Sequence, residues 1–226
     1  GMCEQDTRGF ALMSDMPMLE PCSVAETYEL TKFAFELSEQ IGGPVFVRLV
    51  TNNSQSHACI EIEERILPPE SQPLPVRDTA KFTKAGAAIC MTQHRDLIAR
   101  LAKAEEIIAQ QDRNRMRLGK KDGVGIISVG ITNGYQNEAL ESLSEAGVDV
   151  SEISSLELIA SIPFAKEKIE TMISHCSTLL IAEELEGHIE KYVYMQAYKM
   201  GKQVKILGKE DGTYERIGEY DAQILR

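Results

Sequence analysis

The sequence predicts an α/β protein whose larger part is a doubly wound parallel sheet. Three observations support this fold class. From residue 124 onward, short runs of β-forming residues alternate with amphipathic segments; a helix, a glycine stop and a β-rich run follow one another near the N-terminus; and a proline cluster separates these two regions. Such alternation is typical of parallel strands that carry helices on both faces.

The C-terminal region contains the most regular pattern. Its strands are expected at 124–129, 155–159, 178–182 and 204–207, with helices at 135–146, 165–174 and 187–200. Residues 130–134 form the turn between the first strand and its helix. Because each strand is followed by a helix, the strands are expected to run parallel.

The N-terminal region shows half of a similar unit. Residues 21–40 predict an amphipathic helix with Ser23 as its cap, and Gly42 and Gly43 end it before a strand at 45–50. The polar residues 51–57 follow as a loop. Ligands of open α/β sheets bind beyond the carboxyl ends of the strands, so a ligand would be sought first at this loop.

A proline cluster is the best candidate for a domain linker, because four prolines within eight residues cannot continue a helix or a central strand. They are Pro68, Pro69, Pro73 and Pro75. The sequence therefore divides into residues 1–66, a linker at 67–80 and a domain at 81–226. An apolar stripe over residues 94–117 predicts a long helical arm within the last of these.

Charge and composition exclude several classes of protein. The 226 residues carry a formal net charge of −11, which disfavours binding to nucleic acid or to anionic membranes. No apolar run approaches the roughly 20 residues that span a bilayer. The five cysteines are scattered and the four histidines show no ligand spacing, so no metal site is expected. We expect a cytoplasmic chain with reduced thiols.

Three local patterns have both a structural and a functional interpretation. The turn at Thr132, Asn133 and Gly134 is either a plain tight turn or an anion site at a helix N-terminus. Glu183 and Glu184 either complement the start of the next helix or contact a neighbouring domain. Arg8 lies in a polar stretch that is either a disordered chain start or a binding point for a carboxylate.

Several segments together resemble the α subunit of indolepyruvate:ferredoxin oxidoreductase, a family of thiamine-diphosphate-dependent 2-oxoacid oxidoreductases. The resemblance covers nearly the whole chain and is thinnest at 70–121. It is carried by residues 4–8 (Glu-Gln-Asp-Thr-Arg), 16–21 (Met-Pro-Met-Leu-Glu-Pro), 26–30, 35–39, Pro44, Val45, Arg48, Thr51, Ser54, Glu61, 182–186 and 216–219.

The resemblance implies that residues 1–66 end a pyrimidine-type domain and that 81–226 form a transketolase C-terminal-like domain. It also implies that Gln5, Asp6, Arg8, Thr51 and Ser54 lie near the cofactor or substrate at a domain interface, without an assigned catalytic residue. Asn52 and Gln55 stand where the family usually has arginine and histidine. The 2-oxoacid, indolepyruvate or another aryl or branched one, is therefore left open.

The segments that activate thiamine and bind the metal–diphosphate in this family are not recognisable in the chain, and neither are the cysteine-rich clusters. The chain is therefore expected to be an internal piece or a split subunit, inactive alone. The intact enzyme would use thiamine diphosphate with Mg²⁺ and iron–sulfur clusters to convert a 2-oxoacid to an acyl-CoA. Its expected partners are the rest of the α subunit, a β subunit and ferredoxin, in an oligomer.

Two alternatives remain beside this largely architectural role. The chain is otherwise a non-catalytic interaction module of the same fold, or a regulatory domain that binds a small anion at residues 130–134. In each case residues 1–20 are expected to be poorly ordered or packed on a partner, because the sheet that they would complete is not recognisable in the sequence.

Overall fold

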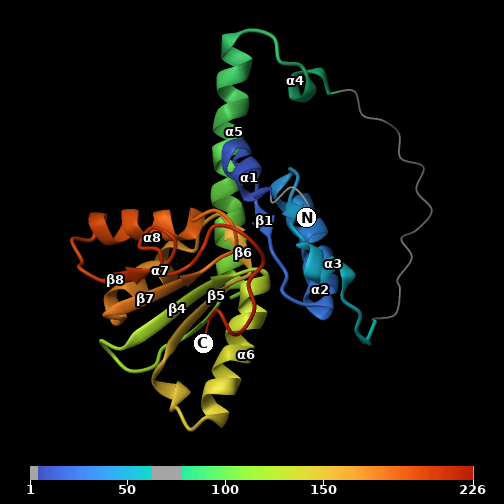
Figure 1. The fold of residues 1–226 in the computed structure, drawn as a ribbon. Coiled ribbons are helices and arrows are strands. Elements are labelled where there is room, and N and C mark those ends of the chain that lie inside the picture. Colours follow the sequence, from blue (N-terminus) through green and yellow to red (C-terminus); the bar gives the residue numbers. More distant parts are fainter. Residues whose placement is uncertain (1–4, 63–77, 226) are drawn as a thin grey trace.

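The computed structural model describes residues 5–62 and 78–225, which contain two β-sheets and the helices that cover them (Figure 1). The helices are α1 (Arg8–Ser14), α2 (Val24–Ile41), α3 (Thr51–Gln55), α4 (Thr79–Phe82), α5 (Ala87–Gln110), α6 (Ile131–Glu145), α7 (Lys166–His175) and α8 (His188–Lys199), with a 3₁₀ turn at Val150–Glu152. The strands are β1 (Met18–Leu19), β2 (Phe46–Val47), β3 (Arg115–Arg117), β4 (Val124–Val129), β5 (Ser154–Leu158), β6 (Ala160–Ile162), β7 (Thr178–Ala182) and β8 (Lys205–Leu207).

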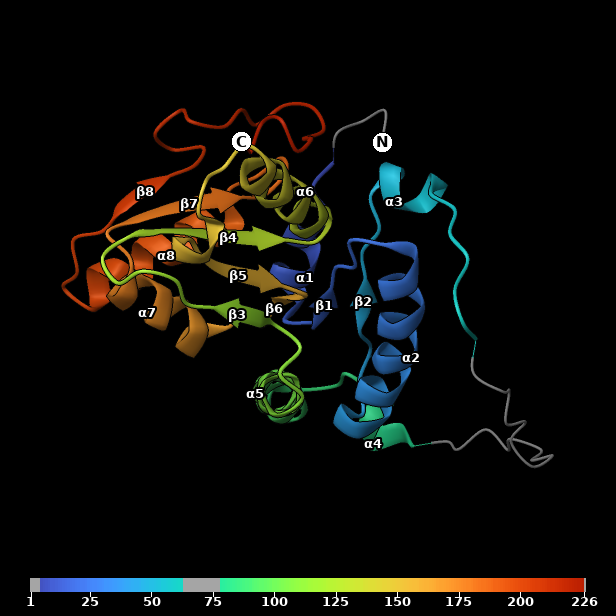
Figure 2. The same cartoon turned by 90° about the horizontal axis from the view of Figure 1, so that it is seen from below.

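The larger sheet has the strand order β3-β5-β4-β7-β8. Strands β5, β4, β7 and β8 run parallel, and only β3 at the edge is antiparallel. Helices α7 and α8 cover one face through a core that includes Ile127, Leu156 and Val193, whereas α6 packs on the other face with Ile126. Figure 2 shows these helices on opposite sides of the strands. The predicted doubly wound α/β fold is confirmed.

The smaller sheet has the order β2-β1-β6 and uses strands of only two or three residues. Strands β1 and β2 are parallel and joined by α2, so these three elements form a complete βαβ unit. Ser23 caps α2 by accepting a hydrogen bond from the Glu26 backbone N–H at 3.2 Å, and Gly42 ends the helix at φ +67°. The cap and the glycine stop agree with the sequence.

A single irregular residue joins the two sheets. Strand β5 ends at Leu158, and after Ile159 the chain continues as β6, which pairs antiparallel with β1. The side-chain oxygen of Asn114 accepts hydrogen bonds from the backbone N–H groups of Ile159 and Ala160, at 2.8 and 2.9 Å. The Glu20 N–H donates to the Ile159 carbonyl at 2.8 Å, so the backbone polar groups at this break are satisfied.

The expected arm at 94–117 differs from the structure at both ends. Helix α5 covers Ala87–Gln110, and Arg115–Arg117 form the antiparallel edge strand β3 instead of the last helical turn. Asp112 adopts φ +48°, a left-handed conformation that ends the helix. Pairing with β5 then decides the conformation of residues 115–117, which helical periodicity alone does not reveal.

Several short elements also differ from the sequence-based expectation. The loop expected at 51–57 contains the helix α3, and the strand expected at 45–50 is reduced to β2. In the turn expected at 130–134, only Gly130 is non-helical, because α6 already begins at Ile131. Residues 58–62 have no regular structure, and most of the proline-rich linker lies outside the described residues. The domain limits stay predictions.

Of the two expectations for residues 1–20, poor order is wrong where the structure describes them, and packing on a partner stays a prediction. Residues 5–20 pack within the same chain: Arg8, Ala11, Met18 and Leu19 are all at most 1% exposed. Strand β1 finds its sheet partner β6 in the C-terminal half of the chain. This pairing between distant segments gives the N-terminal segment a place in a sheet of its own chain.

Candidate functional site

The carboxyl ends of β4, β5 and β7 meet at one edge of the larger sheet. Because β5 and β7 lie on opposite sides of β4, this edge is the topological switch point, where open α/β sheets usually bind ligands. Here it holds charged side chains from distant parts of the chain. We call this set the junction cluster: Asp6, Arg8, Glu20, Arg48, Glu183, Glu184, Glu190 and Lys209.

Arg8 is the central cation of the junction cluster and is 1% exposed. Its guanidinium forms ion pairs with Glu183 at 2.7 Å and with Asp6 at 2.6 Å. It also donates to the backbone carbonyls of Glu184 and Glu186, at 2.7 and 2.8 Å. These internal bonds occupy the donors that the sequence analysis assigned to an incoming carboxylate.

Glu183 complements the start of the next helix, one of the two roles that the sequence left open. Its carboxylate accepts hydrogen bonds from the backbone N–H groups of Ile189 and Glu190 in the first turn of α8, at 3.1 and 2.8 Å. It also binds Arg8 from the N-terminal segment. Burial raises the pKa of Glu183, and the charge of Arg8 opposes that rise.

The charges of Arg8 and Asp6 reinforce each other. Burial alone would lower the pKa of Arg8, but the carboxylates of Glu183, Asp6 and Glu20 raise it above its ordinary value. Burial alone would raise the pKa of Asp6, but the hydrogen bonds and charge of Arg8 lower it. Asp6 and Arg8 are therefore both charged at neutral pH.

Glu20 links the smaller sheet to the switch point. Its carboxylate pairs with Arg48 at 2.5 Å and lies 3.1 Å from the position that a Cβ atom would take at Gly130. Gly130 also adopts φ +59°, so a side chain there would meet both backbone strain and the Glu20 carboxylate. The other oxygen of Glu20 is buried and has no hydrogen-bond partner in the described part of the chain.

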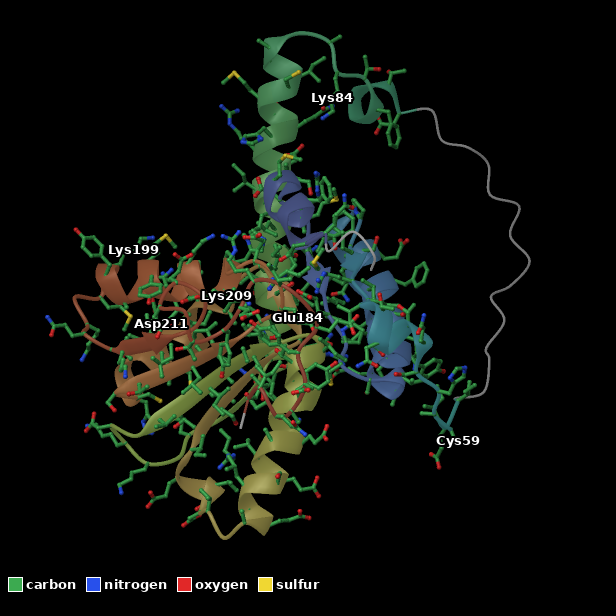
Figure 3. The ribbon with its side chains drawn as sticks, in the orientation of Figure 1. Cys59, Lys84, Glu184, Lys199, Lys209 and Asp211 are labelled. Atoms are coloured by element: carbon green, nitrogen blue, oxygen red, sulfur yellow. The ribbon has the colours of Figure 1, made fainter. Side chains whose placement is uncertain are left out.

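Residues of the C-terminal segment also bond to the junction cluster. Glu190 accepts hydrogen bonds from the backbone N–H groups of Lys209 and Glu210, at 2.7 and 3.1 Å. The Lys209 ammonium donates to the Glu215 carbonyl at 2.9 Å and to the Tyr220 hydroxyl, and burial lowers the pKa of Lys209 to about 8. Figure 3 labels Lys209 and Glu184 in this central region.

The side chains expected to form an anion site are committed to internal bonds. Thr132 and Asn133 are fully buried; the Thr132 hydroxyl bonds to the carbonyls of Val129 and Ala182, and the Asn133 amide to Ser128 and the Leu158 carbonyl. Gly134 lies one residue further along α6, inside the helix. These bonds tie the ends of β4, β5 and β7 together, and an anion site there stays a prediction.

The remaining sequence-predicted positions are dispersed. Thr51 and Ser54 lie on α3, where Ser54 is exposed and donates to the Val50 carbonyl; Gln5 is exposed as well. Of the five predicted positions, only Asp6 and Arg8 belong to the junction cluster. A role for Gln5, Thr51 and Ser54 near a cofactor or substrate stays a prediction.

Sequence reasoning missed Glu20, Glu190 and Lys209. Glu20 belongs to a segment that carries the family resemblance, but nothing local in the sequence identifies Glu190 and Lys209. The two α3 residues between Thr51 and Ser54 also form contacts that the sequence did not indicate. Asn52 donates to the Tyr135 hydroxyl at 2.7 Å, and the buried Asn53 donates to the Pro21 carbonyl at 3.0 Å.

The described residues contain neither a metal-binding group nor a membrane-spanning helix. No group of three or more His, Cys, Asp or Glu side chains is arranged to hold a metal ion. No described helix combines the length and the apolar character needed to cross a bilayer. The four described cysteines, Cys22, Cys59, Cys90 and Cys176, are free thiols.

The chain is similar to known proteins over nearly its whole length. The chain is 31% identical over 224 residues to indolepyruvate oxidoreductase subunit IorA of Methanothermobacter thermautotrophicus, a match that covers 99% of this chain and 35% of that protein. It is 32% identical over 214 residues to the subunit of the same name from Thermococcus kodakarensis, covering 92% and 32%. The chain is a homologue of one segment of IorA. The family resemblance is thereby confirmed.

The chain spans about a third of the length of these IorA relatives, as expected for a sequence that corresponds to part of a larger subunit. No family model matches the chain. Among solved structures it resembles 2-oxoglutarate:ferredoxin oxidoreductase from Magnetococcus marinus, with a TM-score of 0.62 at 14% identity, over 93% of this chain and 41% of that one. At that identity the likeness establishes a shared fold.

Proposed function

We propose that this IorA homologue is the structural junction of a thiamine-diphosphate-dependent indolepyruvate:ferredoxin oxidoreductase. Alone it is inactive; it joins the end of a pyrimidine-type domain to a transketolase C-terminal-like domain. In the assembly it works with the rest of the α subunit, a β subunit and ferredoxin. Thiamine diphosphate with Mg²⁺ and iron–sulfur clusters supply the chemistry, the oxidative decarboxylation of a 2-oxoacid to an acyl-CoA.

The open edge of the smaller sheet carries this proposal. Strand β2 pairs with β1 on one side, and its other edge has no partner strand among the described residues. Beside it lies an apolar groove of about 470 Å³ that is lined by Phe10, Met13 and Phe46, which are 58%, 79% and 37% exposed. An open strand edge beside an uncovered apolar surface is a place where further strands can pair. The rest of the larger subunit would supply them.

The junction cluster does not fit the diphosphate of the cofactor. It contains the carboxyl groups of Asp6, Glu20, Glu183, Glu184 and Glu190. The cations that face them are Arg8, Arg48 and Lys209, which already bind these carboxylates or nearby backbone and hydroxyl oxygens. A diphosphate would meet a surplus of negative charge. The cofactor therefore belongs to segments outside this cluster, and the cluster has a positioning role.

Isothermal titration calorimetry tests the proposal. Thiamine diphosphate with Mg²⁺ is added to the purified chain alone, and then to the chain mixed with polypeptides that carry the remaining parts of an IorA-type subunit and its β subunit from the same genome. We expect heat of binding only in the mixture, because the chain alone lacks a fitting site. Binding by the chain alone, or no binding in a mixture whose components associate, contradicts the proposal.

A non-catalytic interaction module is the second candidate function. The burial of Arg8 favours it, because its guanidinium is 1% exposed and bonds to Glu183, Asp6 and two backbone carbonyls instead of an external ligand. If the same titration shows association of the polypeptides without cofactor binding, this candidate is preferred. Binding of phosphate that is lost in Asn133→Ala, with the fold retained, would instead favour the anion-binding regulatory domain.

A further inference from the structure

One exposed stripe of α5 has the spacing of a helix-pairing seam. The helix is 24 residues long, and its N-terminal half extends away from the two sheets toward α4 (Figure 1). Its opposite face is buried by Ala104, Ile107 and Ile108 against the core of the smaller sheet. The stripe consists of Met91, Arg95, Ile98, Ala102, Glu105 and Ala109, all exposed and separated alternately by four and three residues. An average spacing of about 3.5 residues is that of coiled-coil contact positions.

The stripe of one helix is complementary to the same stripe of a second helix that runs in the opposite direction. If two α5 helices pair antiparallel with residue 100 of each at the centre, Met91 faces Ala109, Arg95 faces Glu105 and Ile98 faces Ala102. Each large apolar side chain thus meets a small one, and each cation meets an anion. A two-fold symmetric interface forms every such pair twice.

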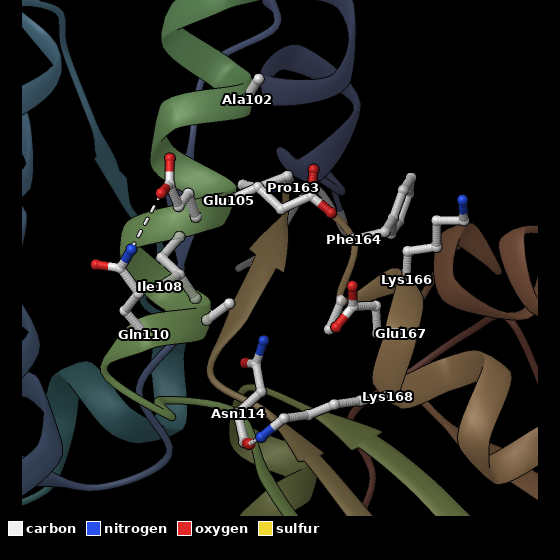
Figure 4. A pocket seen from close by; sticks show the side chains of 13 residues that line it. Ala102, Glu105, Ile108, Gln110, Asn114, Pro163, Phe164, Lys166, Glu167 and Lys168 are labelled. Atoms are coloured by element: carbon white, nitrogen blue, oxygen red, sulfur yellow. Dashed lines mark hydrogen bonds between the residues drawn. The ribbon is translucent and has the colours of Figure 1, made fainter.

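A cleft beside the C-terminal half of α5 matches this arrangement. It has a volume of about 440 Å³ and lies between α5 and the segment 163–168, which leads into α7 (Figure 4). Ala102, Glu105 and Ala109 of the stripe line it, together with Phe164 and Ala165. The cleft has apolar walls and a mixed set of charges, with the carboxylates of Glu105, Glu106 and Glu167 and the ammonium groups of Lys166 and Lys168 in its lining.

The N-terminal half of the stripe has the complementary properties. Met91 and Ile98 are 57% and 54% exposed, so the stripe has uncovered apolar surface along this half of the helix. Arg95 lies between them and supplies a positive charge. Neither Arg95 nor Glu105 forms an ion pair with another residue in the parts of the chain that the structure describes. Both charges are therefore available to a second molecule.

We propose that two copies of this chain associate through antiparallel pairing of α5, each copy placing Met91, Arg95 and Ile98 against the cleft of the other. The apolar side chains fill the space over Ala102 and Ala109, and Arg95 pairs with Glu105. This interface lies on α5, apart from the open edge of β2. It therefore holds or fails independently of the oxidoreductase proposal.

Sedimentation velocity of the full chain with charge-reversal variants tests the interface. We expect the unaltered chain to dimerise, and Arg95→Glu and Glu105→Arg each to raise the dimer dissociation constant about tenfold or more, because two attractive pairs become repulsive. An equimolar mixture of the two variants restores every pair, Glu with Arg on one side and Arg with Glu on the other. The mixture is expected to dimerise as the unaltered chain does, which also shows that both variants are folded.

Lys199→Glu is the matched control, because it makes the same change of charge at the exposed end of α8, away from α5 (Figure 3). It should leave the dimer unchanged. The proposal is overturned if the unaltered chain stays monomeric at about 100 µM, well above ordinary dissociation constants of specific dimers. It is equally overturned if the dimer is insensitive to Arg95→Glu, or if mixing the two variants fails to restore association. A monomer would leave the cleft to other parts of the larger subunit.

Discussion

The two sheets of this IorA homologue are stabilised in different ways. The larger sheet has strands of up to six residues and an apolar core on each face, formed with α6, α7 and α8. The smaller sheet has strands of two or three residues, and buried ion pairs join its segment to the larger one. Arg8 and Glu183, which make the main link, are 175 residues apart. Apolar burial stabilises both sheets, since α2 and α5 form a core on the smaller one. The N-terminal segment of the smaller sheet depends in addition on these buried polar contacts.

Removal of Arg8, the central cation of the junction cluster, should have the largest effect on stability. Arg8→Met leaves the Glu183 and Asp6 carboxylates buried without their partner, and we expect a loss of about 3–5 kcal/mol in the free energy of unfolding. Urea unfolding measures the loss, and hydrogen exchange should show faster exchange in residues 5–20 than in β4. Unchanged hydrogen exchange in residues 5–20 would contradict the role assigned to Arg8 in holding this segment.

The same variant should respond to pH. Burial raises the pKa of Glu183, and loss of Arg8 removes a charge that opposes this rise. The folded variant therefore takes up a proton on Glu183 at a higher pH than the unfolded chain does, so its stability falls as pH increases from 5 to 7. Arg216→Ala, which breaks the exposed ion pair with Glu186, is the control and should leave the unfolding midpoint unchanged at both pH values.

Truncation of the larger core should destabilise the molecule without detaching the N-terminal segment selectively. Leu156 is fully buried in the central core, and Leu156→Ala is expected to lower the free energy of unfolding by about 3 kcal/mol. Hydrogen exchange should then accelerate across the larger sheet. If hydrogen exchange accelerated only in residues 5–20, Leu156 would contribute mainly to holding the N-terminal segment. The two sheets would then not be stabilised separately.

The break between the sheets provides a third test. Asn114→Ala removes the acceptor of two backbone N–H groups, at Ile159 and Ala160, and leaves both buried. We expect a loss of about 2 kcal/mol. Asn114→Asp keeps the acceptor and should recover most of the stability in urea unfolding. Equal losses in the two variants would mean that the oxygen is not the important atom.

The smallest expected effect is local to α2. Ser23→Ala removes the cap of this helix and should lower the free energy of unfolding by about 1 kcal/mol. Ser23→Asp retains a capping oxygen and serves as the matched variant. A loss in thermal unfolding that is as large as that of Arg8→Met would mean that α2 contributes more to the junction than the cap alone.

The sequence alone determined the elements whose signals are local. The strands β4, β7 and β8 and the helices α2, α7 and α8 follow from apolar periodicity, from the Ser23 cap and from the stop at Gly42, because each signal lies within a few neighbouring residues. The family was recognisable for a similar reason, since short runs such as residues 4–8 keep their order along the chain.

Only the tertiary structure decided what those elements do together. Pairing with β5 turned Arg115–Arg117 into a strand, and pairing with β6 gave the N-terminal segment a sheet within its own chain. The fold brings Arg8 next to Glu183 and buries Glu20 and Glu190. A charged residue in a sequence gives no sign of a partner more than a hundred positions away. The physical reason is that ion pairing and sheet pairing depend on distance in space, which local periodicity does not encode.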